Sequence, residues 1–405
     1  MAHVVIVGAG PAGAALAYLL ARRGVEVTLI ERHTDFAREF RGEVLMPSGI
    51  DAFAQMGLRA AFDALPHREI HRVEIYRNGR FLFLLALNRQ QLGSSTFRVV
   101  AQPALLELLV AEARRFPSFR IERGMRVLDV LWENERVVGV RAAGKEGERD
   151  LRGDFVIGAD GRASVLRKRA GLHEERNPQT FDIVWCKIPL PDFLADGATG
   201  RAYLGHGHLA IMFPSYDGRL QIGWVINKGA FGELRRRGIE EWLEEMAQHV
   251  GAELAAHLHA CRAEISHPFV LDVICDRLVR WTAPGLLLIG DAAHPMSPVG
   301  GQGINIALRD ALVAANHLCP VLTRQSTPSE IDGAAARIQE ERLPEVSAIQ
   351  RLQQDPPRLL FQTSPWSGLV LRLLPLLVRT GIAQRLFGFV LRRMALGVTS
   401  VRLTV

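Results

Sequence analysis

The residues with the clearest chemical potential lie between Gly290 and Asn305, in the stretch GDAAHPMSPVGGQGIN. An apolar segment at 286–289 precedes them and is short enough for a buried strand, and a helical pattern from Ile304 to about Leu318 follows. An acidic side chain in this position can accept a hydrogen bond from a sugar hydroxyl. Glycines let a ligand approach the backbone, and free N–H groups at a helix start favour an anionic group. The stretch therefore predicts a site for a ligand with sugar-like and anionic parts.

A second site of this kind is predicted at the N-terminus. Residues 3–7 read as a buried strand, a G-x-G-x-x-G turn opens a helix to about Arg23, and the next strand pattern at 25–30 ends at Glu31. This is the dinucleotide-binding fingerprint in its full context. The first glycine makes the tight turn, the second leaves room for a pyrophosphate, and the third allows close helix–strand packing. The predicted ligand contacts are Gly8, Gly10, Pro11, Ala12, Gly13, Glu31 and Arg32.

A third motif, Gly158-Ala-Asp160-Gly161, lies between the other two. With the three motifs in this order, residues 1 to about 345 resemble the flavoprotein monooxygenases of the para-hydroxybenzoate hydroxylase type, which are single-component FAD-dependent aromatic hydroxylases. The resemblance implies an α/β fold: a Rossmann-type FAD-binding domain with an inserted antiparallel β-sheet substrate domain. In this chain a C-terminal helical tail follows. The motifs are more specific for the fold than for the reaction.

The resemblance also implies further FAD contacts. Arg41 would reach the pyrophosphate or ribose, the alternative being a solvated surface arginine. Gln102 stands where the family usually has arginine, so it can donate a hydrogen bond but lacks the charge. Val127 falls where the backbone usually meets the adenine. Asp160 is expected to combine a cofactor contact with a structural role in its turn.

In the same terms, the stretch from Gly290 would hold the flavin end of the cofactor. Asp291 would contact the ribitol, and Pro298 would lie beside the isoalloxazine ring. The helix start would approach the pyrophosphate and the ring and stabilise negative charge on reduced flavin. Its contacts would be Gly301, Gly303, Ile304 and Asn305. His294 is expected to pack beside the motif, so no catalytic side chain is assigned and the flavin itself is expected to do the chemistry.

The resemblance divides the chain into interleaved domains. A hairpin is expected after residue 72, because Asn78-Gly79 permits the positive φ angles of a two-residue turn. The FAD-binding domain is predicted in three parts and the substrate domain in two. The FAD-binding parts are 1–71, 101–180 and 276–345, the substrate-domain parts are 72–100 and 181–275, and the tail is 346–405.

Strand patterns between 181 and 271, with an amphipathic helical stretch from Gly232 to Cys261, form the larger part of the predicted substrate domain. The inner face of its sheet would cover the flavin. The predicted pocket-lining residues are Met212, Phe213, Trp224 and Phe269; for each of them the alternative is an ordinary core position.

Composition excludes several classes of protein. The net charge of the 405 residues is +6, but seven arginines and no acidic residue lie from Pro356 onward, so the rest of the chain is close to neutral. A general nucleic-acid-binding surface is therefore not expected. The four cysteines are far apart and form no C-x-x-C, so we expect reduced thiols and no metal site. Because a strand pattern begins at His3, we expect no signal peptide and a cytoplasmic location.

The tail holds two apolar helical patterns, at 366–379 and 384–393, with arginines at intervals. Neither has the roughly 20 uncharged residues needed to span a bilayer. Two interpretations stay open: the helices lie peripherally on anionic membrane or take up a lipid-soluble substrate, or they pack on the body as a cap or dimer face. The oligomeric state is open for the same reason.

The chemistry follows from the implied cofactor. Reduced flavin and O₂ give a C4a-hydroperoxide, which transfers one oxygen atom to an electron-rich ring. No second G-x-G-x-x-G follows a strand, so NADPH or NADH is expected to act as a transient electron donor. The prediction is a monooxygenase that hydroxylates an aromatic or lipophilic small molecule. The alternatives are an FAD-dependent reductase of isoprenoid double bonds and a non-catalytic flavin-binding, membrane-associated protein.

Overall fold

The computed structural model describes residues 2–37, 43–87, 92, 96–205, 208–266, 268–360, 373 and 376–405. Its first body is built on a six-stranded sheet, whose four central strands are short and almost completely buried. Five strands are parallel and the edge strand β20 is antiparallel to β21. Continuous burial is expected of a parallel sheet covered on both faces. In sheet order the strands are β20 (Thr282–Ala283), β21 (Leu286–Leu288), β12 (Phe155–Gly158), β1 (His3–Val7), β2 (Glu26–Glu31) and β8 (Phe119–Arg123).

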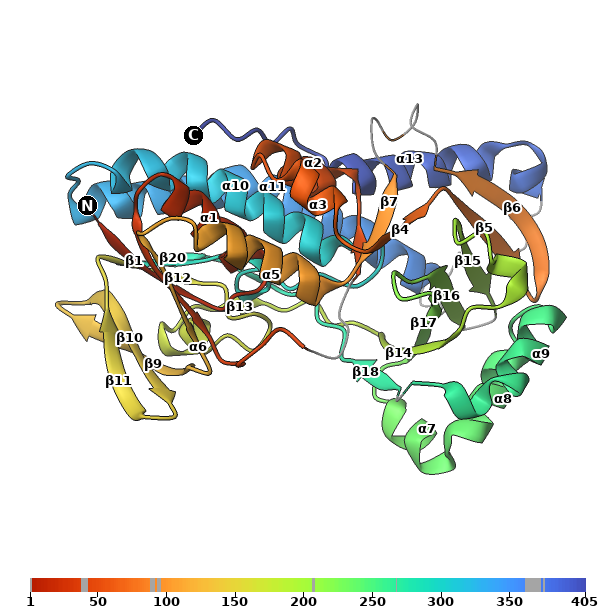
Figure 1. Cartoon of the computed structure of the whole chain (residues 1–405). Coiled ribbons are helices and arrows are strands. Elements are labelled where there is room, and N and C mark those ends of the chain that lie inside the picture. Colours follow the sequence, from red (N-terminus) through yellow and green to blue (C-terminus); the bar gives the residue numbers. More distant parts are fainter. Residues whose placement is uncertain are drawn as a thin grey trace.

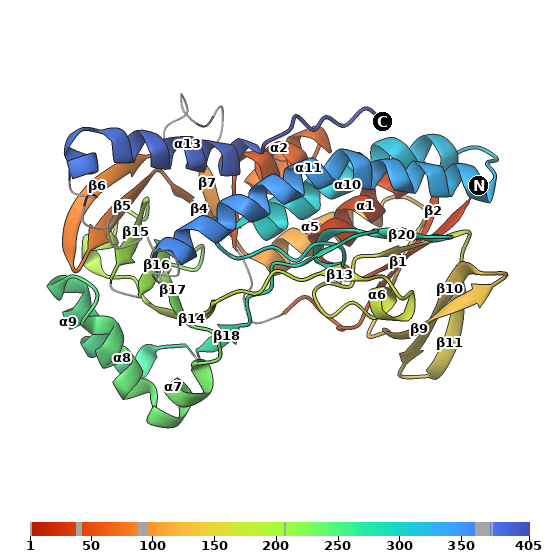
Figure 2. The same ribbon diagram turned by 180° about the vertical axis from the view of Figure 1, so that it is seen from behind.

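Helices cover one face of this sheet and a small antiparallel sheet covers the other (Figure 1). The helical layer contains α1 (Pro11–Arg22), α5 (Gln102–Ala113) and α10 (Gln302–Leu322), and the long α11 (Pro328–Leu360) runs beside α10 (Figure 2). The small sheet contains β9 (Arg126–Glu133), β10 (Arg136–Gly144) and β11 (Gly147–Arg152), with α6 (Val165–Arg169) beside β9.

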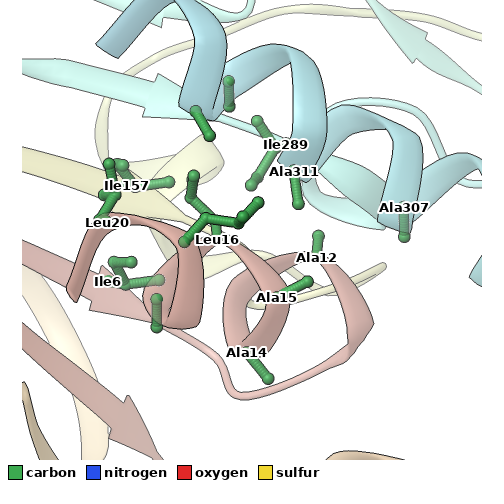
Figure 3. Close-up of a cluster of buried hydrophobic side chains, with 14 of the residues drawn as sticks. Ile6, Ala12, Ala14, Ala15, Leu16, Leu20, Ile157, Ile289, Ala307 and Ala311 are labelled. Carbon is green, nitrogen blue, oxygen red and sulfur yellow. The ribbon is translucent and has the colours of Figure 1, made fainter. Parts of the chain in front are cut away.

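Small side chains let α1 and α10 approach closely. Ala12 and Ala15 on α1 lie near Ala307 and Ala311 on α10, above a layer of branched residues from the strands (Figure 3). Since each helix begins directly after a glycine-rich turn, this contact brings the two predicted ligand-binding turns to the same end of the sheet.

A seven-stranded sheet forms the second body of the molecule (Figure 1). Its neighbours are antiparallel except for the parallel pair β15 and β5. The predicted hairpin is confirmed: β5 and β6 are joined through Asn78 (φ 47°) and Gly79 (φ 73°). In sheet order the strands are β18 (Phe269–Leu271), β14 (Phe181–Pro189), β17 (Arg219–Asn227), β16 (Leu209–Pro214), β15 (Thr199–Leu204), β5 (Arg72–Arg77) and β6 (Arg80–Ala86).

Three helices cover one face of this second sheet. They are α7 (Phe231–Arg237), α8 (Ile239–Ala247) and α9 (Ala252–Ala260). The helical stretch predicted from Gly232 is divided at Gly238, whose φ of 96° is a left-handed conformation that suits glycine, and again at Gly251. The other face of the sheet is turned toward the first body.

A three-stranded sheet lies between the two bodies, in the order β3 (Val44–Leu45), β7 (Phe97–Val100) and β4 (His67–Ile70). The sequence grouped 97–100 with the hairpin, but β7 pairs with β3 and β4 instead. The domain boundaries themselves stay a prediction. The remaining elements are α2 (Pro47–Gln55), α3 (Arg59–Asp63), β13 (Glu174–Glu175) and β19 (Arg277–Leu278).

The C-terminal part of the tail is packed on the body. α13 (Ile382–Leu396) runs along β6 and α2, and the chain then returns over the first body (Figure 1). Gln55 donates to the Val401 carbonyl (3.1 Å) and accepts from the Leu403 amide (2.6 Å). The first predicted tail helix, around Trp366, lies outside the described residues. Within the ranges that the structure describes, there is no helix with the length and apolar character needed to cross a membrane.

The four cysteines are buried free thiols. Burial raises the pKa of Cys186 to about 12 and that of Cys319 to about 11, so both are protonated at neutral pH. The described residues contain no cluster of His, Cys, Asp and Glu side chains that could hold a metal ion.

Candidate functional site

The three glycines of the N-terminal turn have different surroundings. Gly8 has a φ of 98°, and an added Cβ would lie 2.3 Å from the carbonyl oxygen of Ala159. A Cβ on Gly13 would lie 2.0 Å from the carbonyl oxygen of Gly8. At Gly10, by contrast, no heavy atom of the described residues outside its immediate chain neighbours lies within 4 Å of the Cβ position. Gly8 and Gly13 are therefore required by packing, whereas Gly10 borders open space.

The start of α1 faces this open space without a side-chain cap. Gly10 is the N-cap residue, so it has no side chain that could accept a hydrogen bond from the amides of the first turn. Pro11 occupies the first helical position, where its missing N–H costs nothing. The positive end of the helix dipole and the remaining first-turn N–H groups are thus available to an anionic ligand such as a pyrophosphate.

The side chain of Glu31 binds the same turn. Its buried carboxylate accepts hydrogen bonds from the amides of Ala9 and His33, each at 3.0 Å. A carboxylate has about four acceptor positions, so further bonds from ribose hydroxyls are compatible with this arrangement. Arg32 is exposed and its Nε donates to the ring of His33 at 2.9 Å.

For the other predicted contacts on the adenosine side, the structure gives positions in the fold. Gln102 is the first residue of α5, and Val127 is buried in β9 within the main core. Arg41 lies outside the described residues. Their cofactor contacts therefore stay predictions.

The third motif is joined to the second through an arginine. Asp160 accepts from the amides of Val165 (2.7 Å) and Leu166 (3.3 Å) at the start of α6, which is the structural role expected of it, and burial raises its pKa. Arg162 donates to Asp291 Oδ2 (3.1 Å) and to the Met296 carbonyl (3.2 Å). Arg162 directly follows the Gly158–Gly161 motif, but no role was predicted for it. A basic residue directly after Asp-Gly was the available signal.

The two glycine-rich turns meet in space. A Cβ on Gly290 would lie 3.1 Å from the Cβ of Ala12, so the Asp291 segment packs against the first turn of α1. A tight turn follows, in which the amide of Gly301 donates to the carbonyl of Pro298 at 2.9 Å. The open space around Gly303 resembles that at Gly10, since outside its chain neighbours and the backbone of α10 the described residues place no heavy atom within 4 Å of its Cβ position. Ile304 follows in the first turn of α10.

Asn305 holds the start of α10 to β3. Its Oδ1 accepts from the Met46 amide (2.9 Å), and its Nδ2 donates to the Gly301 carbonyl (2.8 Å). The side chain is fully buried. It therefore fixes the shape of the 298–301 turn, and its predicted cofactor contact stays a prediction.

A buried ionic network lies behind this turn. His294 Nε2 lies 2.8 Å from Asp310 Oδ2, and Asp310 Oδ1 accepts from Arg342 Nε at 2.7 Å. Arg342 also pairs with Glu345, whose carboxylate binds Arg309 (2.9 Å) and the Val398 amide (2.8 Å). The network joins the motif, α10, α11 and the C-terminal segment. His294 is thus packed beside the motif, as the sequence predicted.

Charge pairing outweighs burial in this network. Burial alone would raise the pKa of Asp310, but its interactions with His294 and Arg342 lower it to about 2. The pKa of Glu345 is lowered as well: burial would raise it, and Arg342 and Arg309 overcome that effect. Both carboxylates are therefore ionised at neutral pH.

The predicted substrate-lining residues fall on opposite faces of the seven-stranded sheet. Met212 and Trp224 are buried against the helical side, in a core that includes Trp242 on α8, and so do not face the first body. For these two residues the prediction is wrong and the alternative of ordinary core holds. Both faces of β16 are apolar, so the alternation along this strand does not show which face is covered by helices.

Phe213 lies on the face turned toward the first body. Its ring is 6.3 Å from that of Trp185 in an edge-on arrangement. Phe269 is the register partner of Trp185 across β18 and β14, which places its side chain on the same face. Both therefore remain predicted lining residues.

Polar residues on this face were missed. Lys187 interrupts the apolar strand β14, and its Nζ lies 3.3 Å from Glu43 Oε1, 2.9 Å from Ser215 Oγ and 2.9 Å from Asp217 Oδ2. Ser215 donates to Glu43 Oε2 at 3.0 Å. A lone lysine within an apolar strand was the signal that sequence reasoning left unused. Together with Gln221, the register partner of Lys187, these residues are called the polar cluster below.

The surroundings of Gly10, Gly303 and Glu31 fit an extended dinucleotide with two phosphate groups. Comparison with known proteins agrees with this. A family model described as "FAD binding domain" matches residues 1–351. The chain is 33% identical to 6-methylpretetramide 4-monooxygenase of Streptomyces rimosus, over 98% of this chain and 93% of that protein.

Two further matches bear on fold and function. The chain is 29% identical to digeranylgeranylglycerophospholipid reductase 1 of Methanopyrus kandleri, over 75% of this chain and 77% of that protein. It is also similar to the crystal structure of P. aeruginosa PqsL in complex with 2-aminobenzoylacetate, with a TM-score of 0.78 and 26% identity. That alignment covers 91% of this chain and 98% of the PqsL chain.

Proposed function

Because the chain belongs to the FAD-binding domain family of flavin-dependent aromatic hydroxylases, we propose that it hydroxylates an aromatic or polycyclic, lipophilic small molecule with O₂. It is an FAD-dependent oxidoreductase. The observation that carries the proposal is the match to a monooxygenase over almost the full length of both chains, together with two open glycine turns in contact. The non-catalytic alternative is not retained, since the relatives are enzymes.

We propose that the two helix starts hold the phosphates of FAD. The uncapped end of α1 beside Gly10 would take the pyrophosphate from one side, and the start of α10 beside Gly303 would approach it from the other. Glu31 would accept from the adenosine ribose. Asp291, which Arg162 orients, would accept from the ribitol.

Bound FAD supplies the redox chemistry, which in this proposal comprises reduction by NADPH or NADH and oxygen transfer through a C4a-hydroperoxide. The chain's own task is to bind, orient and exclude water. Trp185 and Phe213 give the covering face apolar surface for an aromatic ring. The positive end of α10 would favour negative charge on the reduced ring beside Pro298.

Rapid mixing tests the oxygen-transfer step. Protein reduced without oxygen and then mixed with O₂ is expected to show a transient absorbance band before the oxidised flavin spectrum returns, because a water-excluding site delays breakdown of the oxygen adduct. The measurement is stopped-flow absorbance with and without a panel of aromatic and polyketide ligands. Re-oxidation that is slow and free of a transient under every condition would contradict the proposal.

The similarity to a lipid reductase keeps one alternative function. An FAD-dependent reductase of isoprenoid double bonds would transfer reducing equivalents to substrate without O₂. Anaerobic incubation of reduced protein with polyprenyl substrates separates the two. Saturated product would support the reductase, and product formed only with O₂ would support the monooxygenase.

We also propose that α13 contacts anionic membrane from the cytoplasmic side. Its outward face exposes Leu386 and Phe389, each at 58%, while Phe387 on the same helix contacts Phe83 of β6 at a ring distance of 5.4 Å. Arg385, Arg392 and Arg393 on the same helix are exposed, and no acidic residue follows Pro356. An exposed apolar stripe flanked by arginine is the pattern of an interfacial helix.

Sedimentation with vesicles checks this proposal. The protein is expected to bind phosphatidylglycerol-containing vesicles and not phosphatidylcholine vesicles, and salt should weaken binding because the attraction is partly electrostatic. The double change Leu386→Ser and Phe389→Ser should abolish it. Val279→Ser, at another exposed apolar position, is the control. If the double variant bound like the wild type, or if the helix instead mediated a concentration-dependent dimer, the membrane proposal would fail.

A further inference from the structure

The polar cluster is buried between the two bodies of the molecule. Glu43 and Gln221 are each 1% exposed, and Ser215 is fully buried. Four of its members form a continuous hydrogen-bonded group, in which Lys187 Nζ bonds to Glu43, Ser215 and Asp217. Such a group is costly to bury, so its position calls for a physical reason.

Strand register places the cluster on the face turned toward the candidate site. Lys187 pairs with Gln221, which pairs with Phe213, so the three side chains stand in one row across β14, β17 and β16. Trp185 stands two residues before Lys187 on the same face. Trp185 and Val299, which directly follows Pro298, pack against the same buried cluster around Phe181 and Ile183.

Glu43 approaches from the opposite side. It directly precedes Val44, whose Cβ lies 3.5 Å from the position that a Cβ on Gly301 would take. Glu43 therefore contacts the sheet through its carboxylate, while the next residue contacts the turn proposed to lie beside the flavin ring. Its backbone carbonyl accepts from Val100 at 2.8 Å, which fixes this segment to β7.

Two observations distinguish the cluster from a simple ion pair between domains. The side-chain oxygen of Gln221 is buried and makes no hydrogen bond to any described residue. Burial raises the pKa of Glu43 to about 7, against the lowering effect of Lys187 and Ser215, with Asp217 raising it slightly. A structural clamp requires neither feature, whereas a group that accepts a proton from a ligand benefits from both.

We propose that Glu43 and Gln221 form the anchor for a hydroxyl group on the aromatic ring of the substrate, and that Glu43 takes up the proton of that hydroxyl. The phenolic or enolic O–H bond breaks, the proton moves to the Glu43 carboxylate, and the electron pair stays on the substrate oxygen. The Gln221 side-chain amide then presents its N–H group to that oxygen. No oxidation occurs in this step. The ring gains electron density, which favours attack by electrophilic oxygen.

The surrounding groups have positioning roles. Ser215 and Lys187 hold the Glu43 carboxylate, and Asp217 partly balances the charge of Lys187. The Tyr216 ring lies 4.7 Å from Lys187 Nζ, and Arg219 donates to the Lys187 carbonyl. The identity of the ligand as substrate depends on the proposed function, but the binding of a hydroxylated ring does not.

Equilibrium binding to oxidised, FAD-loaded protein tests the anchor without turnover. The probes are 1,8-dihydroxyanthraquinone and 4-nitrophenol, each compared with its methyl ether, which cannot donate a hydrogen bond. The dissociation constants and the visible spectra, which report ionisation of the bound hydroxyl, are measured as a function of pH. Wild-type protein is expected to prefer a hydroxylated probe over its ether by about tenfold, the effect of one buried hydrogen bond.

Two variants separate the residues. Gln221→Met should remove most of the preference, and Glu43→Gln should also abolish the pH-dependent ionisation of the bound probe near neutrality. The control is Gln248→Met, the same substitution at an exposed position after α8, on the helical side of the sheet. If Glu43→Gln does not fold, Gln221→Met decides the anchor alone.

Equal binding of hydroxylated probe and ether to wild-type protein, binding of neither, or an unchanged preference in Gln221→Met would overturn the anchor. Failure of the proposed function has a different signature. Hydroxyl-dependent binding with no oxygen transfer to any ligand leaves the anchor standing and removes the monooxygenase. Oxygen transfer with binding that ignores the hydroxyl does the reverse.

Discussion

Replacing Gly10 with valine is expected to give a folded protein that no longer binds FAD. The residue has φ −70° and ψ −178°, which any L-amino acid adopts, and the described part of the chain leaves the Cβ position open to 4 Å. The substitution therefore strains no backbone and displaces no neighbour. The isopropyl group would instead occupy the space through which a pyrophosphate reaches the start of α1.

The measurements are the flavin absorbance of the purified protein, the FAD dissociation constant and the far-UV circular dichroism. Gly232→Val is the matched control, because Gly232 also borders open space but lies on α7, far from the glycine turns. Gly8→Val would be a poor test, since its side chain would collide with Ala159. A Gly10→Val protein that purifies yellow and binds FAD normally would refute the N-terminal pyrophosphate assignment.

Arg342→Met is expected to cost about 3–5 kcal/mol of folding stability. The guanidinium is fully buried and bonds to both Asp310 and Glu345. Methionine fills a similar volume but leaves two buried carboxylates with fewer cationic partners. Urea unfolding measures the loss. The control is Arg324→Met, which removes an exposed pair with Glu330 (2.8 Å) and should cost no more than about 1 kcal/mol.

The same network gives a pH dependence of known sign. The pKa of Asp310 falls from 3.8 to about 2 on folding, so its ionised form stabilises the folded state by about 2 kcal/mol above pH 4. This contribution is lost as the pH falls from about 4 to about 2. In Arg342→Met the acid-dependent part should shrink, because Arg342, which helps to lower the pKa of Asp310, is absent. An unchanged slope of unfolding free energy with pH in this range would show that Arg342 does not stabilise the Asp310 carboxylate.

Local patterns were predictable from the sequence, and long-range relations were not. The spacing of Gly8, Gly10 and Gly13 defines a turn within a few residues, so the strand–turn–helix unit followed directly. The Asn78-Gly79 hairpin is local for the same reason. Each of these conformations is determined by residues that are neighbours in the chain.

The arrangement of residues on the substrate side of the site could not be predicted from one sequence. Glu43 and Lys187 are 144 positions apart, and no spacing rule connects them. Met212 and Phe213 are adjacent apolar residues that point to opposite faces of the sheet. A wrong choice of face therefore assigns a core residue to the pocket lining. The pairing of β7 with β3 and β4 is a similar long-range choice.

The contact between Ala12 and Gly290 has a consequence for folding. It joins residues that are 290 − 12 = 278 positions apart, so both halves of the proposed FAD site come together only after a loop of more than half of the chain has closed. Contacts of such high sequence separation form slowly, because the loss of chain entropy precedes the gain in packing. We therefore expect FAD to bind the folded state and not the unfolded chain. Its binding should then stabilise the folded state, so that the unfolding temperature rises with the logarithm of the free FAD concentration.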